Sequence, residues 1–510
     1  MPLLPRLALL LLLAAGALAA RPPSPAGASK RGVSASAFAK QIAADRLWAG
    51  IAIVTEGGNV VLEEAHGLAV PELGVPLKTD HVVPIGSNSK LFTAVAIWQL
   101  QERGKLDVGQ PFTKYANMSA LGLPKDWCPR LGGKDGKPTG GCLPAPTLEQ
   151  LLRMSGGIVD ASNCEYEAGA WEAQYCLTNA TTCFPGSVPA AFYAAVAGAA
   201  DPAAVLAGTG ALLAPFEFAP GSKYHYSNEA YILASHVVEH VSGLPLAAYL
   251  QQHIIGPLGL ASTFMDVSMG QDGVYKNAVP YPAYIAYMAP LDLGMPASDK
   301  AYLGKRTYTS GNVGARGAAP GRWAKTGRAA APSFGGNDFN FATGAGAVQS
   351  SGRDVAKWLR VLTTEPQKLG LSPATLRRML AAPAATAVPY KGPAANGTAA
   401  ASALGALAAR VEFAQGAVVL RGAKGAKGAA AAGGRLGGVE GVYYKGSLGG
   451  FDATYYLVLH PSDASKDVLV FLLTTTDAAG PQDSDHKRVS AGLYGARSFR
   501  HVRASLRLQL

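Results

Sequence analysis

Ser87 and Lys90 have the types and the spacing that nucleophilic catalysis by a serine requires. They precede an apolar stretch, residues 91–104, whose pattern predicts a helix, so side chains three residues apart share one face. A serine hydroxyl is a weak nucleophile until a base takes its proton, and burial lowers the pKa of a lysine until it can be that base. The helix N-terminus adds N–H donors for an oxyanion. The alternative is an ordinary helix cap beside a solvated lysine.

Tyr226, in the sequence Tyr-Ser-Asn, is the second candidate for proton transfer. A phenol beside an ammonium group can pass a proton between a nucleophile and a leaving group. Asn228 would hold the carbonyl or amide of the substrate and steady Lys90. The alternative is a turn in front of a helix, expected over residues 231–242, with Ser227 as its cap.

The sequence around these residues resembles the serine β-lactamase and penicillin-binding protein superfamily, closest to its class C and esterase branch. One similar block, residues 82–112, carries the S-x-x-K motif. Five further blocks match in the family's order between about residue 36 and about residue 475, beginning with residues 50–67, which resemble the hairpin before the nucleophile. They include segments similar to T-I-x-x-L-L-x-H-x-S-G, P-G-x-x-x-x-Y-S-N, P-L-G-M-x-x-T and G-G-x-x-S-T-x-x-D-x-A, over residues 147–157, 220–228, 256–263 and 343–356.

The resemblance implies an α+β fold of the β-lactamase/transpeptidase type, with an antiparallel sheet flanked by helices and a mainly helical lobe. It also implies a site in the cleft between the two parts, with Ser87 at the start of a buried helix. The element order agrees, since an N-terminal hairpin and C-terminal strands enclose a series of helices, which suits one sheet built from both chain ends.

The third motif departs from the family, which has Lys-Thr-Gly or His-x-Gly on an edge strand. Tyr444 takes the position of that cation, Gly446 matches the motif's glycine, and Ser447 matches the residue whose N–H completes the oxyanion hole. Lys445 comes one residue late and should face away from Tyr444 unless a β-bulge intervenes. The family's cation binds carboxylates, so its loss argues against antibiotic hydrolysis and carboxypeptidase activity. Met154 replaces a histidine or threonine and is expected to alter only the rim of the site.

These residues predict a serine hydrolase that transfers an acyl group to Ser87 and then to water, with the N–H groups of Ser87 and Ser447 as oxyanion hole. The expected partner is a small-molecule or peptide ester or amide, and the chemistry requires no cofactor and no metal. The alternatives are a catalytically inert binding protein on the same scaffold, a true β-lactamase or D-peptidase, and a wall-binding structural protein. His236 and His240 share a helix face but lack a third ligand, so we interpret them as core or surface residues.

The composition predicts a globular and secreted protein. The 510 residues are 49% hydrophobic and 15% charged, and the net charge of +11 is scattered, so we expect no nucleic-acid surface. Residues 1–19 have the pattern of a secretory signal peptide, and residues 20–35 that of a flexible segment. No later stretch is apolar for long enough to span a membrane, so none is expected after cleavage of the signal. The oligomeric state stays open.

The cysteines and sequons fit an oxidising compartment. All five cysteines lie between residues 128 and 183 without metal-binding spacing, which favours two disulfides and one leftover thiol. We expect Cys128 to pair with Cys142 across a glycine-rich turn. Sequons at Asn117, Asn179 and Asn396 predict a glycoprotein where the host glycosylates.

One hydrolase domain is expected over residues 36–480, followed by a C-terminal tail, residues 481–510. Residues 381–438 have low complexity and are predicted to be disordered or a loose surface segment. The remaining predicted elements are a hairpin over residues 47–62, helices over 147–154, 190–210 and 354–364, an excursion over 300–341, and paired strands over 450–459 and 468–474.

Overall fold

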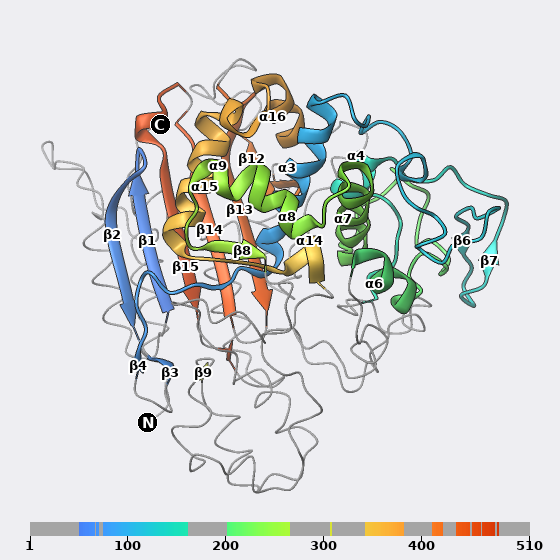
Figure 1. Ribbon diagram of the computed structural model, residues 1–510, viewed down its shortest axis with the longest axis horizontal. Coiled ribbons are helices and arrows are strands. Elements are labelled where there is room, and N and C mark those ends of the chain that lie inside the picture. Colours follow the sequence, from blue (N-terminus) through green and yellow to red (C-terminus); the bar gives the residue numbers. More distant parts are fainter. Residues whose placement is uncertain are drawn as a thin grey trace, which may run out of the picture.

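A computed structural model of the chain shows one large sheet with helices beside it (Figure 1). The structure describes residues 50–66, 68–70, 75–161, 201–265, 307–308, 342–381, 411–421, 435–448, 451–460, 462–474 and 477–478. The segments predicted as signal peptide, flexible N-terminus and C-terminal tail lie outside these residues, as does nearly all of the predicted excursion.

The main sheet has seven antiparallel strands in the order β11-β12-β13-β14-β15-β1-β2. The N-terminal hairpin pairs with β15, so strands from both ends of the domain lie side by side, as the sequence predicts (Figure 1). The strands are β1 Gly50–Glu56, β2 Asn59–His66, β11 Val411–Phe413, β12 Val418–Arg421, β13 Val439–Leu448, β14 Phe451–Val458 and β15 Val468–Thr474.

Helix α15, Gly352–Thr364, packs on the sheet because its apolar residues recur with helical spacing. Ser351 caps the helix by accepting the N–H of Asp354. Gly352 sits so close to the sheet that a Cβ there would lie 2.7 Å from the side chains of Ile53 and Phe471. The buried face of the helix consists of Val355, Ala356, Trp358, Leu359, Val361 and Leu362.

The helical lobe is built around α3, Ser89–Glu102, and α7, Asn228–Ser242, which pack against each other. Helix α3 is buried from its first residue to Leu100, and Phe92 stacks on Trp358 with ring centroids 4.3 Å apart, which joins the lobe to α15. The other helices are α4 Leu148–Leu152, α6 Pro202–Thr209, α8 Leu246–Leu250, α9 Gly256–Leu258, α14 Thr343–Gly346 and α16 Pro373–Leu380.

Short strands tie the segments that connect the helices. A three-stranded sheet in the order β5-β10-β8 lies beside the start of α3, and its strand β5 leads directly into the turn that contains Ser87. The short strands are β3 Leu68–Val70, β4 Val75–Pro76, β5 Val83–Pro84, β6 Leu131–Gly132, β7 Pro138–Thr139, β8 Thr263–Met265, β9 Thr307–Tyr308, β10 Val348–Ser350 and β16 Asp477–Ala478.

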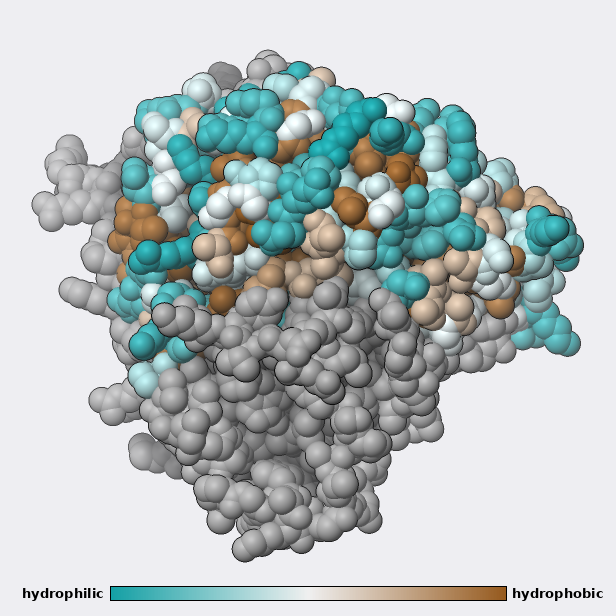
Figure 2. Space-filling model, viewed as in Figure 1, coloured by the Kyte–Doolittle hydropathy of each residue, from teal (hydrophilic) through white to brown (hydrophobic). Residues whose placement is uncertain are grey.

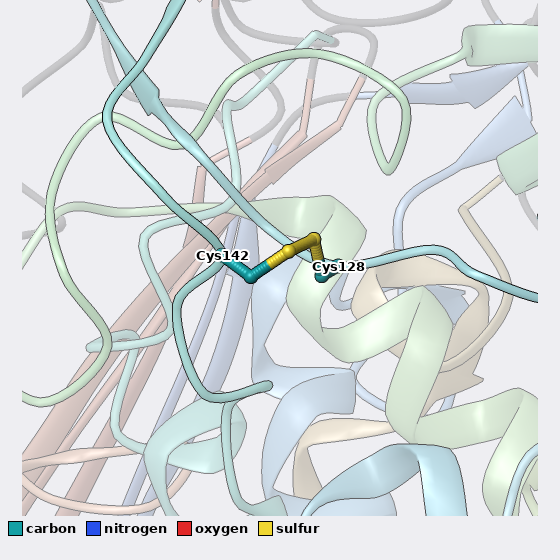
Figure 3. The surroundings of a disulfide bond; sticks show 2 residues. All are labelled: Cys128 and Cys142. Atoms are coloured by element: carbon teal, nitrogen blue, oxygen red, sulfur yellow. A yellow bond between two sulfur atoms is a disulfide. The ribbon is translucent and has the colours of Figure 1, made fainter.

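The predicted disulfide between Cys128 and Cys142 is confirmed (Figure 3). It closes the segment that contains the β6–β7 hairpin, far from the main sheet (Figure 1). The Arg130 carbonyl accepts the N–H of Phe216 at 2.7 Å and so fastens this segment to the lobe. The other three cysteines lie outside the described residues.

Two of the sequence predictions need correction or refinement. Strands β11 and β12 lie inside residues 381–438, and Val418 and Val419 are fully buried, so the prediction of a loose segment is wrong for residues 411–421. The Ala- and Gly-rich sequence on both sides dominates the composition of this segment, although strand β12 contains adjacent β-branched residues and pairs with β13. Helix α7 begins at Asn228, earlier than predicted, because Ser227 caps it by accepting the N–H of Ala230.

The described surface carries few large apolar side chains, of which Val60, Val61 and Leu213 are the most exposed. On the face in Figure 2, hydrophobic residues are interspersed among hydrophilic ones. Among the described residues, no helix combines the length and apolar character needed to cross a membrane.

Candidate active site

Ser87 lies in a single 3-10 turn, η2 Gly86–Asn88, between strand β5 and helix α3. The turn forms because Gly86 adopts a left-handed φ of 51° and its carbonyl accepts the hydroxyl of Ser89 at 2.7 Å. Asn88 fixes the turn to the sheet by donating to the carbonyls of Ile85 at 2.8 Å and Ala453 at 2.9 Å. Ser87 is therefore half-buried at the point where sheet and lobe meet.

The structure brings the side chains of Ser87, Lys90 and Tyr226 together. The Ser87 Oγ and the Tyr226 hydroxyl are 2.6 Å apart, and the Lys90 Nζ donates to the Ser87 Oγ at 3.1 Å. The Lys90 Nζ also lies 4.9 Å from the centre of the Tyr226 ring. A hydroxyl, an amine and a phenol from distant parts of the chain thus form one hydrogen-bonded group.

Lys90 is fully buried, with 0% of its side chain surface exposed. Its Nζ donates to the Asn228 Oδ1 and to the Ala345 carbonyl, each at 2.7 Å, in addition to the Ser87 Oγ. Burial lowers the pKa of Lys90 from 10.5 to about 7, and the nearby Asp160 and Glu229 oppose part of that effect. Near neutral pH the amine can therefore both accept and release a proton.

Asn228 is the first residue of α7 and holds the polar group together. Its Oδ1 accepts from Lys90 and, at 3.2 Å, from the Tyr226 hydroxyl. The predicted contact between Asn228 and Lys90 is therefore present. Because Ser227 caps the helix, the residues on either side of it are held by the start of α7.

The Ala345 carbonyl is a part of the site that sequence reasoning missed. It lies in α14, where the Thr343 φ of 28° makes a strained turn. Gly344 admits no side chain, because a Cβ there would overlap the hydroxyls of Thr93 and Ser235. The Thr93 hydroxyl donates to the Gly344 carbonyl at 2.8 Å, so α3 and α7 together aim the next carbonyl at Lys90. A backbone acceptor has no side-chain signature in a sequence.

Gly446 brings strand β13 against the η2 turn. A Cβ at Gly446 would overlap the Ile85 carbonyl and would lie 2.7 Å from the Ser87 nitrogen. Only a glycine allows the strand to pass this close to Ser87. The backbone of Ser447 follows directly in the same strand, paired with Asp452.

Tyr444 shares a strand face with Gly446, and Lys445 faces the other way. The register of β13 with β14 is continuous, so the bulge that could have restored Lys445 is absent from this pairing. The Tyr444 side chain is 4% exposed, and its ring lies 5.8 Å from that of Phe413. Phe413 in turn lies 5.4 Å from Tyr224. We call these three rings, Tyr224, Phe413 and Tyr444, the aromatic wall.

Met154 does not lie at the rim of the site, so that prediction is wrong. The residue is buried in the core and has a φ of 54°, and its carbonyl accepts the N–H of His225 at 3.0 Å. Its role here is to turn the chain between α4 and the segment that follows.

The histidines His225 and His236 form hydrogen bonds outside the group of Ser87, Lys90 and Tyr226. The His225 Nδ1 contacts the carboxylate of Glu217. His236 is buried and accepts the N–H of Asn117 at 3.1 Å, with the ring of His240 beside it. Within the described ranges, no three histidine, cysteine or acidic side chains group as ligands for a metal.

Asp160 and Glu229 are two further residues of the site that sequence reasoning missed. Their side chains are 1% and 0% exposed, and both act on the charge of Lys90. The Asp160 Oδ1 accepts the N–H of Asn228 at 3.4 Å. Burial, and then Asp160, raise the pKa of Glu229 well above its usual value. The only signal in the sequence is the position of Glu229 directly after Tyr-Ser-Asn.

Comparisons with known proteins identify the family of this chain and several relatives. The family model described as Beta-lactamase matches residues 35–492. The esterase EstB of Burkholderia gladioli is 27% identical over 240 residues, which are 46% of this chain and 50% of that protein. Penicillin-binding protein 4* of Bacillus subtilis is 25% identical over 42% of this chain and 37% of its own length. The chain thus matches about half or less of these relatives.

Solved structures of similar fold cover more of the chain. A penicillin-binding protein from Bacillus halodurans matches with a TM-score of 0.53 and 16% identity, covering 89% of this chain and 99% of that one. EstCE1, a hydrolase with promiscuous acyltransferase activity, matches with a TM-score of 0.54 and 17% identity over 92% and 97%. These likenesses establish the α+β β-lactamase/transpeptidase-like fold. Because the family model matches most of the chain, the chain belongs to the β-lactamase family, whose members are serine hydrolases.

Proposed function

We propose that this protein is a secreted serine hydrolase that forms an acyl-enzyme on Ser87 from an ester substrate. The observation that carries the proposal is the contact of the Ser87 hydroxyl with both the Tyr226 phenol at 2.6 Å and the Lys90 amine at 3.1 Å. A serine held between two proton-handling groups has the arrangement that activates a nucleophile. An inert binding protein has no need of a buried lysine aimed at a serine.

In the proposed reaction, the neutral Lys90 amine takes the Ser87 proton as the Oγ bonds to the ester carbonyl carbon. Tyr226 gives its proton to the leaving alcohol as the ester C–O bond breaks, and the Lys90 ammonium restores that proton. Water then attacks the acyl-enzyme, its proton passes to the same groups, and Ser87 leaves as a hydroxyl. The Ser87 Oγ contacts both Lys90 and Tyr226, and the Lys90 Nζ lies 4.9 Å from the centre of the Tyr226 ring, so the three groups that exchange protons are neighbours.

The backbone N–H groups of Ser87 and Ser447 are the proposed oxyanion hole. The close approach of Gly446 to the Ser87 nitrogen supports this role, because it brings the strand that carries Ser447 against η2. Donors fixed by a turn and a strand do not need to reorganise as charge develops on the carbonyl oxygen.

The substrate class follows from the aromatic wall. A largely buried tyrosine in place of the family's cation brings an aromatic ring and no positive charge, so we assign a neutral ester with an apolar group next to the reacting carbonyl. A substrate carboxylate at this position would have no positive charge to pair with. The esterase EstB among the relatives supports an ester over a β-lactam or a D-peptide.

A panel of neutral esters, matched carboxylate-bearing esters, a β-lactam and a D-Ala-D-Ala peptide tests the proposal. The neutral esters should be hydrolysed best. Ser87→Ala should abolish turnover, and Lys90→Ala and Tyr226→Phe should each lower kcat by roughly 10²–10⁴-fold. Folded protein that hydrolyses no member of the panel would support the inert binding protein, and cleavage of the D-peptide alone would support a D-peptidase.

Secretion and glycosylation are part of the proposal. The signal-like residues 1–19 and the disulfide between Cys128 and Cys142 favour an oxidising compartment. Asn117, in its sequon, is exposed at the surface and open to a glycan. Expression in a glycosylating host should yield protein in the medium that lacks residues 1–19 and loses mass on treatment with an N-glycosidase. Retention of the full-length chain inside the cell would contradict this.

A further inference from the structure

Asp160 and Glu229 place two carboxyl groups in the interior beside the Lys90 amine. Both are almost completely buried, one from the segment after α4 and the other from the first turn of α7. The charge of Asp160 raises the pKa of Glu229, so the two groups are neighbours that cannot both be ionised without a large cost in free energy. Two neutral acids would leave a protonated Lys90 without a counter-charge.

The two carboxyl groups have different surroundings. The Asp160 Oδ1 accepts the backbone N–H of Asn228, so it sits at the N-terminus of the 15-residue helix α7, where the helix dipole favours an anion. Neither oxygen of Glu229 has a hydrogen bond of normal length and angle, and both are buried. Burial and the neighbouring Asp160 raise the pKa of Glu229 well above its usual value, and the backbone N–H groups of Glu229 and Ala161 offset only part of that effect, so the neutral acid is favoured.

We propose that Asp160 and Glu229 form one buried acid pair that holds a single proton on Glu229 and a single negative charge on Asp160. The pair positions the N-terminus of α7 and supplies a fixed counter-charge to Lys90. It does not touch the substrate, and this role rests on the proposed function of Ser87 and Lys90. Its effect is to raise the proton affinity of the amine, because without the anion the buried lysine would take up a proton only at lower pH.

The other groups that face Lys90 do not supply this charge. The rings of Tyr226 and Tyr231 lie 4.9 Å and 5.7 Å from its Nζ, and burial raises the pKa of Tyr231 well above its usual value, so that phenol stays neutral. Arg153, which acts on Tyr231 from the end of α4, is paired with Glu149 at 3.0 Å. Among the described groups, Asp160 and Glu229 are the acids close enough for a negative charge to raise the pKa of Lys90, and with the proton on Glu229 that charge lies on Asp160.

Two isosteric variants separate the members of the pair. Asp160→Asn removes the anion but keeps an oxygen that can accept the Asn228 N–H. The rate at which a fluorophosphonate labels Ser87 is measured against pH. In Asp160→Asn the acidic limb of this profile should lie about one pH unit lower than in the wild type, which corresponds to a tenfold lower proton affinity of Lys90. Glu229→Gln replaces a neutral acid by a neutral amide, so the limb should stay within about 0.3 units.

Asp354→Asn is the matched control, because Asp354 also lies in the first turn of a helix and accepts a backbone N–H, that of Ser262 at 2.7 Å. It is expected to lower the melting temperature without moving the limb. The assignment of the charge is overturned if Asp160→Asn leaves the acidic limb where it is in the wild type. It is also overturned if Glu229→Gln moves that limb as far as Asp160→Asn does.

An infrared measurement tests the proton without relying on activity. The difference spectrum between the wild type and Glu229→Gln at neutral pH should show the carbonyl stretch of a protonated carboxylic acid, which ionised carboxylates lack. A spectrum without that band overturns the inference, even where Asp160→Asn does not fold. Wild-type protein that shows the band but takes no fluorophosphonate refutes the proposed function and upholds the shared proton.

Discussion

At the scale of single residues, Lys90 determines how the site responds to pH. Three hydrogen bonds satisfy its amine, yet burial makes the charged form costly, and the pKa falls to about 7. The same residue on a helix surface would remain an ammonium group at every physiological pH. The proposed chemistry of Ser87 therefore depends on the burial of its neighbour as much as on its own position.

Ester hydrolysis should follow the deprotonation of Lys90. The lysine has a lowered pKa and, in the proposed mechanism, is the base in its neutral form, so kcat/KM should rise with pH through a midpoint near 7. A pH profile of kcat/KM with a neutral ester measures this midpoint. A midpoint near the ordinary lysine value of 10.5 would contradict the role of Lys90 as base.

At the scale of elements, the alternation of strand β13 decides which side chains face Ser87. Gly446 and Tyr444 share one face, and the unbroken pairing with β14 keeps Lys445 on the other. The strand therefore places a buried tyrosine where the family has a cation.

Tyr444→Lys should restore recognition of a carboxylate. We expect it to raise the ratio of kcat/KM for a carboxylate-bearing ester over its neutral match by about tenfold, which corresponds to about 1.4 kcal/mol. Lys445→Ala, on the opposite face, is the matched control and should leave the ratio unchanged. A shift caused by Lys445→Ala instead would mean that the assignment of faces is wrong.

Gly446→Ala should lower the turnover number of the enzyme. The added methyl group would overlap the Ile85 carbonyl and push β13 away from η2, so we expect kcat to fall by about 10²-fold or more through the loss of an oxyanion-hole donor. Gly141→Ala, where the added atom meets nothing within 4 Å, is the control. Unchanged kcat in Gly446→Ala would refute the close approach of the strand.

At the scale of the whole molecule, the site exists because the sheet and the helical lobe meet at η2. The Trp98 Nε1 donates to the Gln415 Oε1 at 2.5 Å, and Gly416, with a φ of 82°, lies against the backbone of Lys90 and Leu91. The β11–β12 turn thus holds the start of α3 from the sheet side. By contrast, the disulfide segment lies on the far side of the lobe (Figure 1).

Removal of the disulfide should lower stability and spare activity. Replacing Cys128 and Cys142 by alanine frees a loop with a sequence separation of 14, for which the expected loss is about 3 kcal/mol of unfolding free energy. Because the segment does not touch Ser87, kcat at moderate temperature should stay within about twofold. Chemical denaturation and an ester assay measure the two quantities, and a loss of activity without a loss of stability would contradict this picture.

The sequence predicts those parts of the fold and site that have a local pattern. The S-x-x-K spacing, the Tyr-Ser-Asn motif and the apolar period of α3 are visible in short windows, and the structure brings Ser87, Lys90 and Tyr226 together. The hairpin at residues 50–66 and the pair β14–β15 have the alternation or apolar runs typical of strands.

The rest depends on tertiary contacts. The Ala345 carbonyl is backbone, and Phe413 lies in a segment whose composition predicts no structure. The expectation for Met154 fails because neighbouring motifs do not tell which way a left-handed residue points its side chain. Asp160 and Glu229 are far apart in the chain, and only their shared burial makes them a pair.

The most direct test of the account is the covalent labelling of Ser87. Intact mass measurement after reaction with a fluorophosphonate should show one adduct, and peptide fragmentation should place it on Ser87. Ser89→Ala, which removes a buried hydroxyl bonded to the Gly86 carbonyl in the same turn, should still be labelled, while Ser87→Ala should not. Folded wild-type protein without an adduct, or an adduct that survives Ser87→Ala, would contradict the account.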